Sequence, residues 1–366
     1  MQGFCSPPQL TQGRTPPRLF FAGKFFGETV AAEWEDRIGG RVCPNFFSSS
    51  SVVTDTIYGS TSPFVLLVHH RHAFMNWDPV RFIQKTFFPE GFPSHPHRGF
   101  VTVTYCLAGG MLHRDSMGIK QAYGAEQRHG GNHVQWLNTG SGLQHEEMWD
   151  VSEPDEKDEG SLLQTSSQEL YQIWLNVPSS QKMTGPKAQL LQKYGMKDES
   201  DKPPPYSTPI ITEGGVTTTV VCGDHNGVHA PWDIPTDAAI LRVELTKGAT
   251  WEHSMPVSHK TAIIYVKSGF IEIEGDRIAP HHTAYLTQGG QTLTVHACDD
   301  SADILLLSGA PILAPCYSQG SMVMNSQSEI QQAYQDYQSG HMGVPWDYKL
   351  TDEEWQEHIK RYPSIY

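Results

Sequence analysis

Short strand-like runs dominate this sequence and limit its fold to an all-β architecture. Between about residues 50 and 178, alternating or apolar runs are separated by Gly, Asn, Asp and Pro, the pattern of a β-sandwich or β-barrel. The clearest run, Val101–Leu107, alternates β-branched and aromatic residues and is followed by Gly109–Gly110. Similar runs resume at Val216 and continue to Leu307. The sequence therefore predicts two β-rich halves.

The stretch between the two halves has a different composition. Residues 181–210 are rich in Lys, Gln, Ser and Pro and include Pro203–Pro205, which favours a linker. We therefore expect one domain over residues 50–180 and a second over residues 211–320. The length of 366 residues suits two domains.

The last segment, residues 321–366, is predicted to be a helical tail. Ser326–Glu329 and Thr351–Glu354 both match the capping-box pattern that starts a helix. Helices in such tails usually cover a sheet edge or bridge two domains.

Residues 1–49 are predicted to be an N-terminal extension. The first 27 residues lack Asp and Glu but contain Arg14, Arg18 and Lys24, which gives a faint likeness to an organellar targeting segment. Several prolines there weaken an amphipathic helix, so a disordered tail is the alternative.

Charge and composition exclude several classes of protein. The formal net charge of −14 repels nucleic-acid phosphates and no Lys/Arg run forms a basic patch, so we expect no direct nucleic-acid binding. No run of about 18 apolar residues could span a bilayer, so no membrane association is expected. The six cysteines are dispersed, which favours free thiols in a reducing compartment. A cytoplasmic or nuclear location is expected.

Two short segments carry the residues that bind metals. His95 and His97 are two residues apart, and His145 and Glu147 repeat this spacing. In an extended strand, residues i and i+2 lie on one face, about 6.6 Å apart. Two such strands that face a common space would bring three imidazoles and one carboxylate together. The alternative is a set of partly exposed surface histidines.

The same alternation predicts what surrounds the metal. Counted from His97, it turns Val101, Val103 and Tyr105 toward the same interior, and counted from Glu147 it does so for Trp149. We expect these four residues to line a pocket. Simple core packing is the alternative for each of them.

The donor types narrow the choice of metal. Imidazole nitrogen and carboxylate oxygen suit Fe, Mn, Ni, Cu or Zn, and the lack of a nearby thiolate argues against a closed structural zinc site. With two open positions on the ion, a substrate oxygen and O₂ could meet there. The histidines after residue 250 do not repeat the i, i+2 pairing, so the second half is predicted to lack metal.

The motifs together resemble those of the pirin family, a branch of the cupin superfamily. The resemblance rests on His95–Tyr105, on His113–Gly118 and on Gly142–Met148, and it extends over most of residues 60–343. It implies an all-β fold of two tandem cupin-type antiparallel β-barrels. It also implies one iron ion in the first barrel, held by His95, His97, His145 and Glu147. Because Val101 stands where the family commonly has Glu, the fourth ligand is expected to be Glu147.

The resemblance implies two functions. Some pirin-like proteins have quercetin 2,3-dioxygenase activity, and others are nuclear, iron-dependent transcriptional co-regulators. We expect a mononuclear iron-binding dioxygenase that acts on a small aromatic, flavonol-like substrate. The alternative is a non-enzymatic, redox-dependent module that binds a protein partner. Iron, as Fe(II) or Fe(III), is the expected metal, and Mn, Ni, Cu and Zn are the alternatives.

Overall fold

The computed structural model describes most of the chain from residue 61 onward and three short strands before it. The described ranges are 10–13, 18–20, 33–38, 61–75, 89–125, 129–150, 165–193, 206–232, 234–286 and 292–365. Apart from those three strands, the predicted N-terminal extension lies outside the described residues, and this holds for the proposed targeting segment apart from residues 10–13 and 18–20.

The N-terminal half is built from two antiparallel sheets. The larger sheet has eight strands in the order β13-β12-β9-β6-β11-β4-β3-β2. These are β13 (Ser207–Thr208), β12 (Lys187–Lys193), β9 (Asn132–Asn138), β6 (Phe100–Ala108), β11 (Thr165–Asn176), β4 (Phe64–Met75), β3 (Glu33–Ile38) and β2 (Arg18–Phe20). The smaller sheet has the order β5-β10-β7-β8, with β5 (Gly91–His97), β10 (Leu143–Trp149), β7 (Gly110–Asp115) and β8 (Lys120–Gly124). Only the short contact of β12 with β13 is parallel among these pairs.

The C-terminal half repeats this arrangement. Its larger sheet has the order β1-β23-β20-β25-β18-β15-β14. These are β1 (Leu10–Gly13), β23 (Thr283–Leu286), β20 (Thr261–Ser268), β25 (Ala302–Gly309), β18 (Ala238–Leu245), β15 (Val216–Cys222) and β14 (Ile210–Glu213). The smaller sheet consists of β19 (Thr250–Ser254), β24 (Thr292–Ala297), β21 (Ile271–Ile273) and β22 (Asp276–Ile278). A hairpin of β16 (Asp224–His225) and β17 (Val228–His229) accompanies it.

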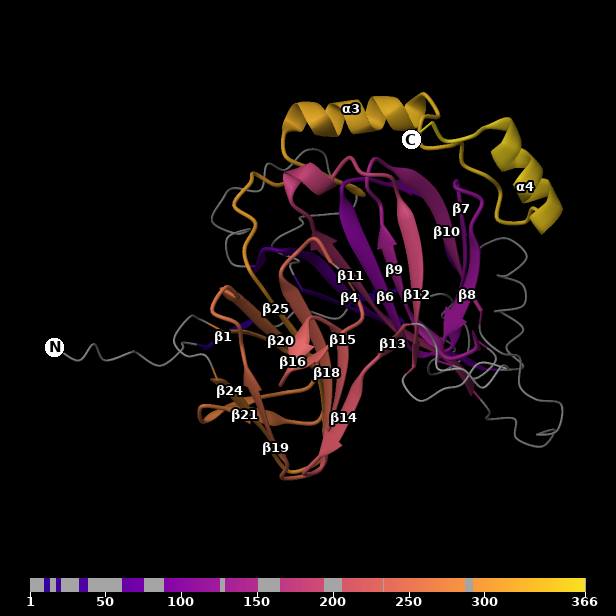
Figure 1. Cartoon of the computed structure of the whole chain (residues 1–366). Coiled ribbons are helices and arrows are strands. Elements are labelled where there is room, and N and C mark those ends of the chain that lie inside the picture. The colour runs from indigo at the N-terminus through magenta and orange to yellow at the C-terminus, as the bar shows by residue number, and fades with distance from the viewer. Residues whose placement is uncertain are drawn as a thin grey trace.

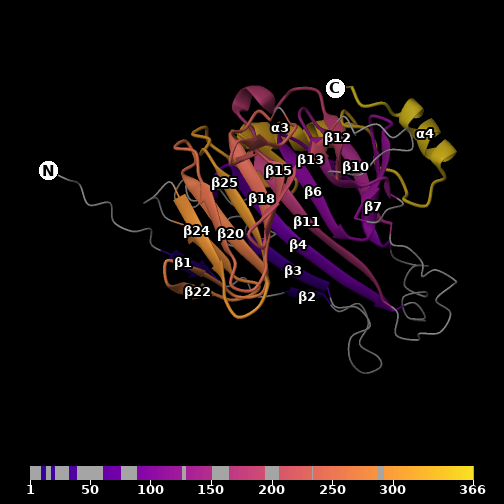
Figure 2. The same ribbon diagram turned by 60° about the horizontal axis from the view of Figure 1, so that its bottom comes forward.

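The two larger sheets pack against each other and form a shared core. Val103 and Ile173 from the N-terminal sheet lie in one buried cluster with Ile240, Ile263 and Leu305 from the C-terminal sheet. Burying each such side chain contributes about 1.5–3 kcal/mol. Figures 1 and 2 show the two β-rich bodies side by side, with the smaller sheets on the outside. The predicted all-β fold with two β-sheet bodies is confirmed.

Segments outside the predicted domain boundaries pair with strands of the two larger sheets. β1 pairs with β23 of the C-terminal sheet, whereas β3 pairs with β4 of the N-terminal sheet. Residues 187–193, expected to belong to the linker, form β12 and pair with β9. The boundaries at residues 50–180, 181–210 and 211–320 therefore stay predictions, and part of the linker serves the N-terminal sheet.

The tail forms a hairpin and two helices. The hairpin consists of β26 (Tyr317–Gln319) and β27 (Met322–Met324), and the helices are α3 (Gln327–Gln338) and α4 (Asp352–Arg361). The Ser326 side chain accepts a hydrogen bond from the Glu329 amide at the start of α3, and Thr351 forms a full capping box before α4. Figure 1 shows both helices along the N-terminal barrel.

Two sequence expectations can be checked against the described residues. No helix in the described ranges is long and apolar enough to cross a membrane. Four cysteines in the described part of the chain are free thiols, namely Cys106, Cys222, Cys298 and Cys316.

Candidate metal centre

The two short histidine segments form neighbouring antiparallel strands. β10 pairs with β5, and His145 lies directly opposite His95. Residues opposite each other in an antiparallel pair point to the same side of the sheet. His97 follows two residues after His95 and therefore points to that side as well.

The register of β5 and β10 shifts between His145 and Glu147. Glu147 pairs with Phe92, one residue further along β5 than an unbroken register would place it. A bulge of this kind locally turns the strand and re-aims the side chains beside it. The extra residue lies on β5, whereas β10 keeps an unbroken register with β7, so His145 and Glu147 stay on one face of β10.

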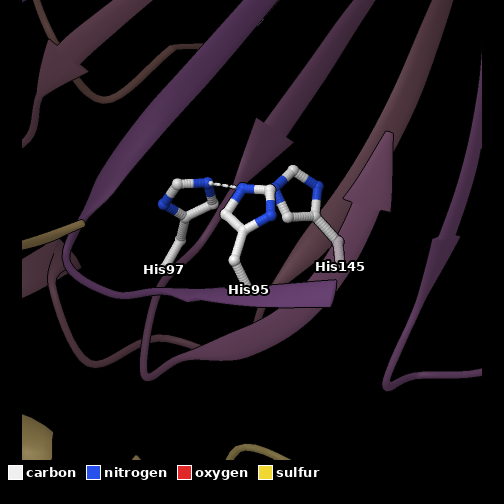
Figure 3. Close-up of side chains that lie close together, drawn as sticks. All are labelled: His95, His97 and His145. Carbon is white, nitrogen blue, oxygen red and sulfur yellow. Dashed lines mark hydrogen bonds between the residues drawn. The ribbon is translucent and has the colours of Figure 1, made fainter. Parts of the chain in front are cut away.

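His95 lies within hydrogen-bonding distance of both other imidazoles, and the ligand atoms of all three lie within 4.8 Å of one another. His95 Nε2 lies 3.0 Å from His97 Nε2 and 3.0 Å from His145 Nε2. Figure 3 shows the three rings converging from β5 and β10. Two nitrogen ligands at 90° around an ion, each about 2.1 Å from it, lie about 3.0 Å apart. The spacing of these nitrogens thus fits a shared metal ion.

The three imidazoles are held in the neutral form that binds metals. Burial lowers the pKa of His95, and burial together with the charge of His95 lowers the pKa values of His97 and His145 well below their usual range. His95 also has a defined tautomer. Its Nδ1 donates to the carbonyl of Pro93 at 2.8 Å, which leaves the lone pair on Nε2 facing the other two rings.

These three histidines are the one group of at least three potential metal ligands found within the described ranges. The donor set is nitrogen-rich, neutral and mostly buried, which fits a divalent metal ion. We therefore identify His95, His97 and His145 as a candidate site for a divalent metal.

Glu147 lies beside this cluster but is not a member of it. Its Oε1 accepts hydrogen bonds from the hydroxyl groups of Tyr123 at 2.9 Å and Thr104 at 3.2 Å. Its Oε2 accepts from Gln172 Nε2 at 3.1 Å. Burial lowers the pKa of His95, and the Glu147 charge offsets part of this lowering because the two groups are close enough to interact. Ligation by Glu147 stays a prediction.

The partners of Glu147 come from strands whose sequences gave no metal signal. Burial and the Glu147 charge raise the pKa of Tyr123 well above its usual range, so this phenol stays protonated and donates. Thr104 and Gln172 face each other across β6 and β11. The sequence signal for these partners is a polar residue at facing positions of two buried strands.

The face of β6 that alternation from His97 assigns to the metal differs from the face that contacts Glu147. Val101, Val103 and Tyr105 lie in the core shared with the C-terminal sheet, whereas Thr104 on the same strand contacts Glu147. Alternation does not run unbroken from His97 because Gly99, with φ of +87°, turns the chain before β6 begins. A Cβ at Gly99 would lie 2.1 Å from the Val323 carbonyl oxygen, so only glycine fits this turn.

Trp149 lies on the barrel side of this arrangement. It packs against a buried cluster that includes Cys106, Met111 and Tyr123. Its role as a pocket residue stays a prediction, as does the expectation that the C-terminal barrel holds no metal.

The outward-facing neighbours of the candidate ligands bind the C-terminal tail. Gln144 Nε2 donates to the Gly343 carbonyl at 2.9 Å. Glu146 pairs with Arg114 through Oε1 and accepts from Trp346 Nε1 at 2.8 Å through Oε2. One face of β10 therefore carries the candidate site, and the other face is held by the tail.

Comparisons with known proteins agree with this architecture. Residues 47–175 match the family model described as "Pirin", and residues 240–343 match "Pirin C-terminal cupin domain". The chain is 33% identical to "Pirin-1" of Arabidopsis thaliana over 258 residues, which cover 69% of this chain and 78% of the relative. It is 32% identical to a protein of Pseudomonas aeruginosa named "Putative quercetin 2,3-dioxygenase" over 262 residues, covering 69% and 81%.

A solved structure shares the fold over nearly the whole chain. The crystal structure of quercetin 2,3-dioxygenase from Acinetobacter baumannii superimposes with a TM-score of 0.68 and 24% identity. The match covers 93% of this chain and 99% of that one.

Proposed function

This chain belongs to the pirin family, and on that premise we propose that it is a mononuclear metal-dependent dioxygenase of flavonol-like, quercetin-type substrates. The observation that carries the proposal is the convergence of His95, His97 and His145 as neutral imidazoles around one point. The relative named as a quercetin 2,3-dioxygenase supports the choice of reaction.

We propose iron as the metal, with Glu147 as the fourth protein ligand. Three imidazoles and one carboxylate, without a thiolate, are a donor set that iron accepts, although Mn, Ni, Cu and Zn accept it too. When bound, an iron ion would supply a Lewis-acid centre and the redox chemistry for O₂.

The protein's own groups then have defined tasks. Glu147 is the carboxylate beside the cluster, and in this proposal it accepts the proton of the substrate's enol hydroxyl. Tyr123, Thr104 and Gln172 hold the Glu147 carboxylate in place through three hydrogen bonds. Because Tyr123 stays protonated, it can continue to donate while Glu147 changes its protonation state.

Aromatic side chains close one side of the cluster. Phe100 and Trp174 meet the His97 ring edge to face, with centroid distances of 5.3 and 5.5 Å. Both side chains are buried, with exposures of 0% and 2%. They exclude water from His97, which strengthens electrostatic interactions at the centre.

The alternative, a non-enzymatic redox-dependent module that binds a protein partner, is not favoured. His97, His145 and Glu147 are at most 2% exposed, so a partner could not contact them directly. A change of charge at the centre would have to reach the surface through other residues. The dioxygenase function requires no such transmission, and a relative carries the name of that enzyme.

Anaerobic loading with Fe(II), followed by O₂ and quercetin, tests the proposal. We expect O₂ uptake and loss of quercetin absorbance that require both the metal and the flavonol. Elemental analysis of the purified protein identifies the metal that it carries. Metal binding without any O₂ uptake would contradict the dioxygenase assignment.

A pair of histidine variants separates the site from general effects. His97→Ala should lose both bound metal and turnover. His229→Ala replaces a histidine in the C-terminal hairpin whose side chain is 75% exposed, and it should keep both.

A further inference from the structure

A second strand contacts the candidate site from the side opposite β5. β7 pairs with β10, with Asp115 opposite His145 and His113 opposite Glu147. His113, Asp115 and His145 are all 0% exposed. The structure places His113 inside the barrel next to His145.

These three side chains form a continuous chain of polar contacts. His145 Nδ1 lies 3.4 Å from His113 Nδ1, and His113 Nε2 lies 3.0 Å from Asp115 Oδ2. The other oxygen, Asp115 Oδ1, accepts hydrogen bonds from the amides of Met117 at 2.9 Å and Ile119 at 3.0 Å. The turn that follows β7 thus fixes the carboxylate, and the carboxylate contacts His113.

The chemistry of these groups determines which atom donates and which accepts in each of these hydrogen bonds. An ionised carboxylate only accepts, so His113 Nε2 carries the hydrogen that faces Asp115. In the neutral imidazole, His113 Nδ1 is then an acceptor, and His145 Nδ1 must donate to it. The lone pair of His145 is consequently on Nε2, the atom that faces His95.

The other two histidines of the cluster are held differently. His95 donates from Nδ1 to the backbone carbonyl of Pro93. His97 interacts with the backbone of Ser321. His145 is therefore the member of the cluster whose tautomer depends on side chains.

We propose that His113 and Asp115 are positioning residues of the metal centre, which hold His145 in the tautomer with a free Nε2 lone pair. This inference rests on the proposed metal binding by His95, His97 and His145. In this proposal, two residues that do not touch the metal help to determine the affinity of the site for it. Groups that orient a ligand in this way typically change metal affinity 10–100-fold when replaced.

Asp115→Asn is the decisive variant, because it keeps the shape of the side chain and reverses the direction of the hydrogen bonds between residues 115, 113 and 145. The Asn oxygen can still accept from Met117 and Ile119, while its amide donates to His113 Nε2. His113 Nδ1 then carries the hydrogen, His145 Nδ1 must accept it, and His145 Nε2 turns a hydrogen toward the cluster. We expect about a 10–100-fold loss of Ni(II) affinity, measured by competition with a chromophoric chelator.

A second readout does not depend on metal. In metal-free protein with ¹⁵N-labelled histidine, NMR reports which ring nitrogen of His145 is protonated. We expect Nδ1 in the wild-type protein and Nε2 in Asp115→Asn. If the folded variant kept the wild-type tautomer and bound Ni(II) within twofold of wild type, the positioning role would be overturned.

Paired variants separate positioning from loss of structure. His113→Gln can still accept from His145 and donate to Asp115, so it should bind Ni(II) more tightly than His113→Leu, which can do neither. Asp237→Asn alters an Asp–His contact with His259 in the C-terminal half and should leave Ni(II) affinity unchanged. Equal affinities of the two His113 variants would contradict the proposal.

Failure of the metal site itself gives a distinct result. If wild-type protein bound no Ni(II) or Fe(II), the proposed function would fail. The NMR tautomer of His145 would still decide whether Asp115 and His113 control this ring.

Discussion

Arg98, the residue after the candidate ligand His97, forms a buried ion pair with Asp336 in helix α3. Arg98 Nη1 lies 2.7 Å from Asp336 Oδ2, and the two side chains are 1% and 7% exposed. Arg98 Nε also donates to the Ser141 carbonyl at 2.6 Å. This pair joins the turn after the histidine motif to a helix 238 residues away in sequence.

Removal of Asp336 should therefore destabilise the fold. Asp336→Ala leaves the buried Arg98 guanidinium without its carboxylate, which typically costs about 3–5 kcal/mol. Chemical denaturation followed by circular dichroism measures the loss. Asp299→Ala breaks an ion pair with Arg277 whose side chains are 70% and 52% exposed, and it should cost no more than about 1 kcal/mol. Similar losses of unfolding free energy in both variants would show that the buried ion pair stabilises the fold no more than the exposed one.

Glu146 and Glu147 are predicted to have separate effects although they are adjacent. Glu147→Gln should lower metal affinity by more than about tenfold with a smaller loss of stability. Glu146→Gln weakens the contacts to Arg114 and Trp346 and should lower the unfolding free energy by about 3 kcal/mol, with metal affinity nearly unchanged. Calorimetric metal titration and denaturant unfolding of both variants provide the test, and a reversed pattern would contradict the assigned directions of the two side chains.

The turn at Gly99 should not tolerate a side chain. Gly99→Ala places a Cβ 2.1 Å from the Val323 oxygen and imposes a left-handed conformation on alanine. The conformation alone costs about 1–2 kcal/mol, and the clash adds to it. Gly248→Ala is the matched control, because Gly248 has φ of +73° with nothing within 4 Å of the added Cβ. The difference in unfolding free energy between the variants measures the clash, and equal losses would place Val323 elsewhere.

Stability should fall in mild acid because His133 is buried in its neutral form. Burial lowers the pKa of His133 to about 4, while Nδ1 contacts the Gly131 carbonyl and Nε2 contacts the Thr208 hydroxyl. Between about pH 6.5 and pH 4 the unfolded chain binds this proton and the folded chain does not, so stability decreases as pH falls through that window. One such group contributes at most about 1.4 kcal/mol per pH unit.

Unfolding free energies of wild type and His133→Gln at several pH values provide the measurement for this prediction. The variant should show a shallower decrease between pH 6.5 and pH 4. His229→Gln, at an exposed position, should follow the wild-type slope. An unchanged slope in His133→Gln would assign the acid sensitivity to other groups.

Local sequence patterns predicted much of the molecule because they act over a few residues. Alternation in Val101–Leu107 predicted a strand, and the capping boxes at Ser326 and Thr351 predicted both tail helices. The i, i+2 spacing selected His95, His97 and His145 before any contact was known. These features depend on side-chain periodicity and on backbone groups close in sequence.

Other features depend on contacts between distant segments, which no local pattern encodes. The strand packing brings Glu147 to Tyr123 and Gln172, and the turn at Gly99 places Val101, Val103 and Tyr105 in the core between the two larger sheets.

The sequence by itself determined that this is a β-rich protein with a histidine motif suited to metal, because strand periodicity and donor chemistry are properties of neighbouring residues. Only the tertiary structure decided that His113 and Asp115 stand behind His145 and that the tail closes over the opposite face of β10. Strand register and the packing of the tail fix these contacts, and both are set by the free energy of the whole fold.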